Sequence, residues 1–339
     1  MTADIRTVDF DRLSYPASAL EFLEELGQAT WIRQPGRDAS RTRALVTLLH
    51  GNEPSGTYAV LQWLKSGETP ATNVVFYLAS VDTALTRPTF SHRMLPNEPD
   101  ANRCFREPFA GRQGRRAAAV LKLLSDEHPE ALVDLHNNTG HNPAYGVATR
   151  FSPPILRLTE MFAERLVYTD LRLGTLVEAT ESWFPSTTIE CGRAGDPEAD
   201  ELAFEGLKRF LMAKDLRLDE PPERKLEILE NPLRVSLHGG LKLGFGTKPD
   251  HSVDVTVNLQ LERSNFRRLD AGATVGWAPV GSMPLKAVGA GGANVASELF
   301  YNSAGTIKTR ASLVPVMMTV NPTIALSDCL FYAMQRKPD

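Results

Sequence analysis

Short apolar runs alternate with amphipathic segments over the first two thirds of the sequence. Four runs have the length and composition of buried strands, at residues 44–49, 73–80, 131–136 and 186–191. Helical spacing of apolar residues is found in segments 18–29, 54–67, 115–128, 153–167 and 198–212. This alternation is typical of a largely parallel sheet that is covered by helices on both faces. It predicts an α/β domain over residues 1–215.

The pattern changes after a charged, proline-containing segment at residues 216–225, "LRLDEPPERK". Short β-like runs follow, such as "VDVTVNLQL" and "ASLVPVMMTV", and glycine-rich turns separate them. Runs of this kind, divided by turn residues, favour strands over helices. We therefore predict a small all-β domain over residues 225–339 that follows the α/β domain and shapes access to the substrate.

The composition argues against several classes of protein. The 339 residues include 42% hydrophobic residues, and the net charge is -4, which gives no attraction to nucleic acid or to an anionic membrane. No apolar run approaches the roughly 20 residues of a membrane span, and the first residues do not resemble a signal peptide. The three cysteines do not form a disulfide framework, so we expect a cytoplasmic protein. Self-association is left open.

Three of the apolar runs finish near a side chain that can bind a metal or carry a proton. His50, with Glu53 three residues later, ends the first run, and His136 ends the third. Parallel strands bring their carboxyl ends to one edge of the sheet, so these side chains are expected to lie together. Two imidazoles and one carboxylate form a common catalytic zinc set, which leaves one position for water. One zinc per chain is therefore predicted, bound by His50, Glu53 and His136.

Glu190 lies near the end of the fourth apolar run and is predicted to act as the general base that takes a proton from the attacking water. Each residue alone has a structural explanation. A lone histidine at a strand end is more often structural than a ligand, Glu53 could favour the start of a helix, and Glu190 could pair with a buried arginine. The metal-site hypothesis therefore rests on the set and not on any one residue.

A long aperiodic loop, residues 88–109, carries further candidates. Asn102 and Arg103 are adjacent in it, and Arg93 lies upstream. An arginine fork binds carboxylates in a bidentate way. One arginine for a substrate carboxylate and another for a developing oxyanion would suit amide hydrolysis.

Four motifs, "HGNEPSG", "DANRCF", "DLHNNT" and "IECG", occur in the order found in the succinylglutamate desuccinylase/aspartoacylase family. The sequence resembles this branch of the zinc carboxypeptidase-like fold over roughly residues 44–215. The resemblance implies a zinc-dependent α/β hydrolase domain followed by a smaller β domain.

The resemblance also implies roles for single residues. It assigns zinc to His50, Glu53 and His136, the substrate carboxylate to Asn102 and Arg103, and catalysis to Glu190. The family's oxyanion-polarising arginine corresponds to Arg93 or, as the alternative, to Arg87. The segment "ELFYNSAG" resembles one that contributes a tyrosine to the substrate pocket in aspartoacylase, which makes Tyr301 a candidate.

One stretch departs from the family pattern. Aspartoacylase has a tyrosine and an arginine shortly before its catalytic glutamate, whereas residues 171–190 here offer Glu178, Glu181, Trp183 and the more distant Arg172. The expected substrate is therefore neither N-acetylaspartate nor N-succinylglutamate itself.

The sequence thus predicts a zinc-dependent deacylase of N-acyl amino acids or related small carboxylate amides. The alternatives are a metallocarboxypeptidase of short peptides and a non-catalytic metal-binding or regulatory protein of the same fold. A serine hydrolase, a His-Glu-x-x-His protease and a Rossmann dinucleotide-binding protein are disfavoured, because their motifs do not occur.

Overall fold

The computed structural model describes residues 5–138, 140–327 and 329–337, and its chain divides into two compact units. The first unit consists of Met1–Asn137, Ala144–Val167 and Arg172–Leu226. The second consists of Asn138–Pro143, Tyr168–Leu171 and Glu227–Asp339. Two short segments from the first part of the chain therefore belong to the second unit.

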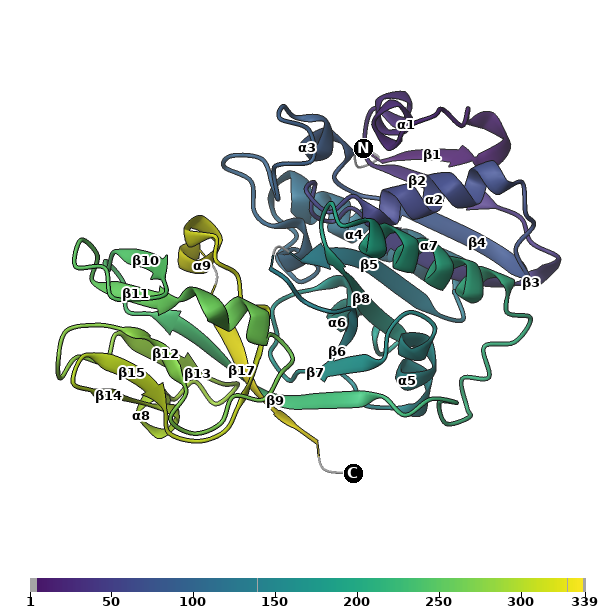
Figure 1. Ribbon diagram of the computed structural model, residues 1–339. Helices are drawn as coiled ribbons and strands as arrows, with labels where there is room; N and C mark the ends of the chain where they lie inside the picture. Colours follow the sequence, from purple (N-terminus) through teal and green to yellow (C-terminus); the bar gives the residue numbers. More distant parts are fainter. Residues whose placement is uncertain (1–4, 139, 328, 338–339) are drawn as a thin grey trace. The chain divides into compact units, whose positions relative to one another are not determined.

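A mixed sheet forms the centre of the first unit (Figure 1). Its strand order is β1 (Arg6–Asp9), β2 (Thr30–Gln34), β4 (Thr72–Leu78), β3 (Asp38–Thr47), β5 (Leu132–Asn138), β8 (Ser186–Arg193), β6 (Tyr145–Ala148) and β7 (Arg165–Tyr168). The strands β4, β3 and β5 run parallel, while β2 is antiparallel to β4 and β6 is antiparallel to β8.

Helices cover both faces of this sheet, as the sequence predicts. Alternate residues of β3 point to opposite faces, so Leu45 joins one apolar cluster and Val46 joins the other. The first cluster contains α1 (Ala19–Leu26), α2 (Ser55–Ser66) and α7 (Pro197–Met212). The second contains residues of α4 (Gly111–Glu127). The predicted α/β class is therefore confirmed.

One predicted helix is wrong in its second half. Helix α5 spans Pro153–Glu160, and after a turn the chain forms β7 at the sheet. Leu166 and Val167 are buried there. A short apolar run fits a buried strand as well as a buried helix, and sheet pairing decided between them here. The remaining elements of this unit are short: α3 (Val81–Leu85), α6 (Leu176–Thr180), η1 (Phe10–Arg12) and η2 (Ala101–Arg103).

The second unit is built mainly from strands. One sheet has the order β10 (Leu243–Gly246), β11 (Val255–Asn258), β12 (Thr274–Trp277), β15 (Thr306–Thr309) and β14 (Phe300–Ser303). In addition, β9 (Glu227–Leu237) pairs with β13 (Leu285–Val288) and β17 (Phe331–Arg336), and β17 pairs with β16 (Val314–Val316). Three short helices complete it: η3 (Leu259–Ser264), α8 (Ala296–Leu299) and α9 (Pro322–Ser327). In the described part of the chain, no helix has both the length and the apolarity needed to cross a bilayer.

Candidate active site

The turn between β3 and α2 carries His50 and Glu53. Strand β3 ends at Thr47, so His50 does not lie on the strand tip that the sequence predicts but in the following turn. Leu48 adopts a left-handed conformation with φ 58°, and the Glu53 N–H donates to the His50 carbonyl at 3.2 Å. The chain therefore turns sharply between Leu48 and Glu53. A Cβ on Gly51 would lie 2.7 Å from Thr83, which explains why glycine occupies this position.

The side chains of His50, Glu53 and His136 converge in the interior of the first unit. His50 Nδ1 lies 2.8 Å from Glu53 Oε1, and His136 Nδ1 lies 2.7 Å from Glu53 Oε2. All three side chains are buried, and their candidate ligand atoms lie within 4.8 Å of one another. His136 lies inside β5, so the sheet brings the two histidines together over 86 positions of sequence, from 50 to 136.

In each histidine, the ring nitrogen that does not face Glu53, Nε2, lies close to a second carboxylate. His50 Nε2 lies 3.0 Å from Asp100 Oδ1, and His136 Nε2 lies 2.9 Å from Asp134 Oδ2. A carboxylate on Nε2 holds the proton there and leaves the Nδ1 lone pair for a metal. Both Nδ1 atoms are directed at the Glu53 carboxylate, so the donor set has the composition of a catalytic zinc site.

The electrostatics of the group are dominated by burial and by the opposite charges within it. Burial opposes the charged form of Glu53, but His50 and His136 outweigh it and lower the pKa of the carboxyl. Burial likewise opposes the charged form of His136, but Asp134 and Glu53 raise its pKa.

Glu190 lies in β8 beside this group. Its Oε2 atom is buried and accepts no hydrogen bond from the residues that the structure describes. Burial raises the pKa of this carboxyl to about 8, while His136 acts in the opposite direction. The residue thus combines an unsatisfied carboxylate oxygen with a pKa near neutrality, which suits a group that takes up and releases a proton.

Arg93 is the candidate oxyanion-binding arginine whose side chain reaches the group. Its Nη1 lies 3.5 Å from Glu53 Oε1, and its Nε and Nη2 lie 3.1 and 2.8 Å from Asp100 Oδ2. The Arg93 carbonyl accepts the Gly51 N–H at 3.1 Å, which attaches the loop to the turn that carries His50. For Arg87 the structure gives a backbone contact, in which its carbonyl lies 3.1 Å from His92 Nε2.

Asn102 and Arg103 lie in η2 of the same loop. Asn102 is buried, its Oδ1 accepts the Leu176 N–H at 3.0 Å, and its Nδ2 lies 3.5 Å from His136 Nε2. Arg103 is partly exposed and donates from Nη1 to the Asn102 carbonyl at 2.8 Å. Its charge is one of those that lower the pKa of the Asp100 carboxyl, after His50 and Arg93. The side-chain oxygen of Asn102 is therefore used within the protein, whereas the guanidinium of Arg103 has charge to offer a ligand.

Residues 171–190, which depart from the family pattern, contain one arginine, Arg172, and this arginine forms an ion pair. Arg172 Nη1 lies 2.8 Å from Glu181 Oε1. Thr175 caps α6, and the Glu178 carboxylate accepts the backbone N–H groups of Leu173 and Gly174, which precede the helix. Trp183 is half exposed. The last candidate, Tyr301, lies in β14 of the second unit with the Arg310 guanidinium 5.2 Å from its ring centre, and its role in substrate binding stays a prediction.

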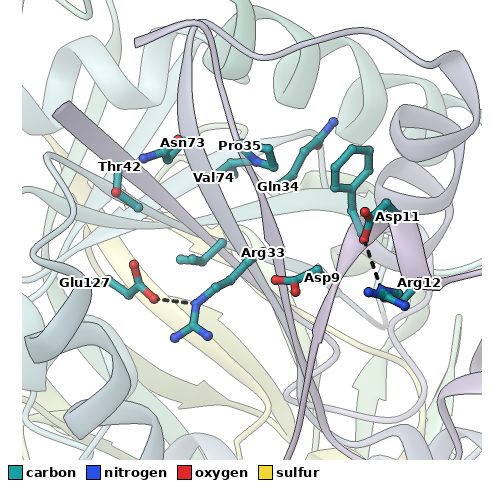
Figure 2. Close-up of a pocket in the computed structure, with 12 residues that line it drawn as sticks. Asp9, Asp11, Arg12, Arg33, Gln34, Pro35, Thr42, Asn73, Val74 and Glu127 are labelled. Carbon is teal, nitrogen blue, oxygen red and sulfur yellow. Dashed lines mark hydrogen bonds and ion pairs between the residues drawn. The ribbon is translucent and has the colours of Figure 1, made fainter. Parts of the chain in front are cut away.

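A cavity of about 390 Å³ lies elsewhere in the first unit (Figure 2). It is lined by residues of β1, η1, β2, β3, β4 and α4, among them Asp9, Thr42 and Asn73. Two pairs of its charged groups interact, since Arg33 Nε lies 2.8 Å from Glu127 Oε1 and Arg12 Nε lies 3.9 Å from Asp11 Oδ1. Because Thr42 and Asn73 precede the carboxyl ends of their parallel strands, this cavity is separate from the histidine group.

The three-dimensional arrangement matches solved structures of one enzyme group. A succinylglutamate desuccinylase from Vibrio parahaemolyticus aligns with a TM-score of 0.62 at 14% identity, over 96% of this chain and 97% of that chain. One from Chromobacterium violaceum gives 0.56 at 15% identity, over 89% and 86%. Murine aminoacylase 3 gives 0.54 at 17% identity, over 89% and 97%. No protein-family model and no curated protein sequence matches the chain.

The chain has the succinylglutamate desuccinylase/aspartoacylase fold. The resemblance that the four motifs indicate is thereby confirmed at the level of the fold. Within that fold, the structure adds three residues that sequence reasoning did not single out: Asp100, Asp134 and Asn137. All three lie inside the quoted motifs, Asp134 and Asn137 in "DLHNNT" and Asp100 in "DANRCF", but only the contacts show which atoms they bind.

Proposed function

We propose that this protein is a zinc-dependent hydrolase that cleaves the amide bond of an N-acyl amino acid or a related small carboxylate amide. The observation that carries the proposal is the convergence of His50 Nδ1 and His136 Nδ1 on the two oxygens of Glu53, with Glu190 beside them. The fold supports it, since solved structures named as a desuccinylase and as an aminoacylase share that fold. A cytoplasmic location stays a prediction.

His50, Glu53 and His136 would hold the zinc, with Asp100 and Asp134 behind the histidines. When bound there, zinc supplies a Lewis acid that can lower the pKa of water to ~7. Glu190, a carboxyl whose pKa burial raises to about 8, would be favoured in its ionised form by a cation held at these ligands.

Glu190 is assigned the proton transfers. Its carboxylate accepts a proton from the attacking water as the water oxygen bonds to the amide carbon. The same carboxyl then delivers that proton to the amide nitrogen as the carbon–nitrogen bond breaks, which releases a carboxylic acid and an amine. The Arg93 guanidinium, with Nη1 directed at Glu53, is the donor for the oxyanion that forms on the carbonyl oxygen.

Arg103 is assigned the carboxylate of the substrate. Its guanidinium is partly exposed beside Asn102, whose Nδ2 is directed toward His136. A guanidinium at this place can form a charge-assisted, bidentate contact with a carboxylate and so hold the amide against the site. The paired state of Arg172 supports a substrate other than N-acetylaspartate or N-succinylglutamate.

Metal analysis and a substrate screen test the function together. The purified parent protein should contain one zinc per chain, and His136→Ala should lose most of it, while the control variant of an exposed histidine, His251→Ala, should keep it. The screen compares N-acyl amino acids with dipeptides. Faster cleavage of dipeptides would favour the peptidase alternative. Full retention of zinc by His136→Ala, or no hydrolysis of either class by the zinc-loaded parent, would refute the proposal.

A further inference from the structure

The Asn137 side chain lies at the centre of a buried polar network next to the candidate metal ligands. Its exposed fraction is 2%, and it directly follows His136 in β5. Its Oδ1 accepts the Ser55 N–H at 3.0 Å, and its Nδ2 donates to Ser55 Oγ at 2.8 Å and to the Gly192 carbonyl at 3.2 Å. Both ends of the amide are therefore satisfied inside the protein, and this pattern also defines which end is oxygen.

The network joins the three segments that carry the candidate ligands and base. Ser55 begins α2, two residues after Glu53, and Gly192 lies in β8, two residues after Glu190. In addition, the Asn137 N–H donates to Glu53 Oε2 at 3.3 Å, the same oxygen that His136 Nδ1 contacts. One residue thus ties the end of β5 to the start of α2 and to β8.

Asp200 forms the outer end of this network. The Ser55 hydroxyl donates to Asp200 Oδ1 at 2.5 Å, and Asp200 lies in the first turn of α7. Because the single hydroxyl proton goes to Asp200, the lone pairs of Ser55 Oγ are left to accept from Asn137 Nδ2. Asp200 therefore orients Ser55, and Ser55 orients the Asn137 amide.

The network contacts segments that the proposed function assigns to the metal and to proton transfer. A metal site tolerates little displacement of its ligands, and groups behind the ligands commonly change metal affinity 10- to 100-fold. The backbone N–H of Asn137 donates to one candidate ligand, Glu53, and Asn137 directly follows another, His136.

We propose that Asn137, oriented by Ser55 and Asp200, is a positioning residue that sets the spacing of Glu53, His136 and Glu190. The inference rests on the proposed function, since it assigns these three side chains to the metal and the base. Asn137 touches neither the metal nor the substrate in this proposal and acts only through the segments that it joins.

The test measures the affinity of the metal-free protein for Zn²⁺ alone, by competition with a chromophoric chelator, and separately measures Tm and steady-state kinetics. Asn137→Ala should weaken zinc affinity about 10- to 100-fold and lower kcat, with little change in KM, because Arg103 is unaltered. Its matched control is Asn73→Ala. The Asn73 amide also bridges backbone groups of the first unit, the Gly36 N–H and the Ala39 carbonyl, both at 3.0 Å, but it lies at the cavity of Figure 2.

A second, milder pair keeps the inference testable if Asn137→Ala does not fold. Asp200→Ala removes the carboxylate that accepts the hydrogen bond from the Ser55 hydroxyl, whereas Glu198→Ala removes an exposed carboxylate from the same turn of α7. Asp200→Ala should weaken zinc affinity several-fold and Glu198→Ala should not, although both lose a favourable charge at the helix start.

Unchanged zinc affinity in both Asn137→Ala and Asp200→Ala, or equal losses in the variants and their controls, would overturn the positioning role. If Asn137→Ala does not fold, the Asp200→Ala and Glu198→Ala pair alone decides. Failure of the proposed function would look different, because the parent protein itself would then bind no zinc or hydrolyse no N-acyl amino acid.

Discussion

Asp100 contacts His50 through one carboxylate oxygen and Arg93 through the other. Oδ1 lies 3.0 Å from His50 Nε2 and also accepts the Asn102 N–H at 2.8 Å, while Oδ2 lies 2.8 Å from Arg93 Nη2. Burial opposes the charge on Asp100, but His50 and Arg93 keep the pKa of this carboxyl well below its usual range. The candidate metal ligand His50, the proposed oxyanion arginine Arg93 and the loop of Asn102 therefore all contact one ionised side chain.

The first prediction concerns this link. Asp100→Ala removes the partner of His50 Nε2 and releases Arg93, so zinc affinity should fall about 10- to 100-fold and kcat should fall with it. Glu98→Ala is the matched control, because Glu98 also anchors the loop through Arg112, at 2.6 Å, without contacting the histidines. Zinc titrations of the two variants give the answer. If Glu98→Ala loses as much zinc affinity as Asp100→Ala, the effect comes from the loop as a whole.

The second prediction concerns proton transfer. Glu190→Gln keeps the shape of the side chain but cannot accept the proton, so kcat should fall roughly 10²- to 10⁴-fold. Zinc content should stay at the parental level, because Glu190 is not assigned as a ligand. Steady-state kinetics on zinc-loaded protein check the rate, and elemental analysis checks the metal. A variant that works at the parental rate would show that Glu190 is not the base.

The third prediction concerns the substrate carboxylate. Arg103→Ala removes a charge-assisted contact of about 1.5–3 kcal/mol, which corresponds to a loss of roughly 10- to 100-fold in kcat/KM for N-acyl amino acids. The matching N-acyl amino amides lack the charge and should be hardly affected, and Arg103→Lys should restore only part, since an ammonium cannot form the bidentate fork. Arg106→Ala, an exposed arginine three residues later, serves as control. Equal losses for acids and amides would refute carboxylate selection by Arg103.

The fourth prediction concerns stability against acid. Asp82, at the start of α3, lies 3.3 Å from Arg116 Nη1 and also pairs with Arg112. Burial opposes its charge, but Arg116 and Arg112 lower the pKa of the carboxyl. Because the pKa of Asp82 is lower in the folded protein than in the unfolded chain, its charge stabilises the folded state. This stabilisation is complete above ~3.9, the pKa in the unfolded chain, and is lost as the pH falls through the lower pKa of the folded protein.

Asp82→Asn should therefore lower the free energy of unfolding by about 1–3 kcal/mol at pH 7. The difference from the parent should shrink as the pH falls below about 4. Urea unfolding of both proteins between pH 7 and pH 3 measures this. A difference that stays constant over that range would show that the charge of Asp82 contributes nothing and that only its hydrogen bonds matter.

The sequence by itself determined the class of fold and the residues that could carry chemistry. Periodicity is a local property, so apolar runs such as 73–80 and helical segments such as 198–212 identify strands and helices from neighbouring residues alone. The same locality explains the error at residues 161–167, where an apolar stretch fits either element until it is paired in a sheet.

Only the tertiary structure decided which atoms meet. The contacts that build the site join segments far apart in the sequence. They include the two histidine Nδ1 atoms at Glu53, Asp100 at His50, and the network of Asn137, in which Ser55 and Asp200 are 145 positions apart. It also decided that 138–143 belongs to the second unit. No periodicity encodes such contacts, because they arise when buried polar groups must find partners once the sheet and helices have packed around them.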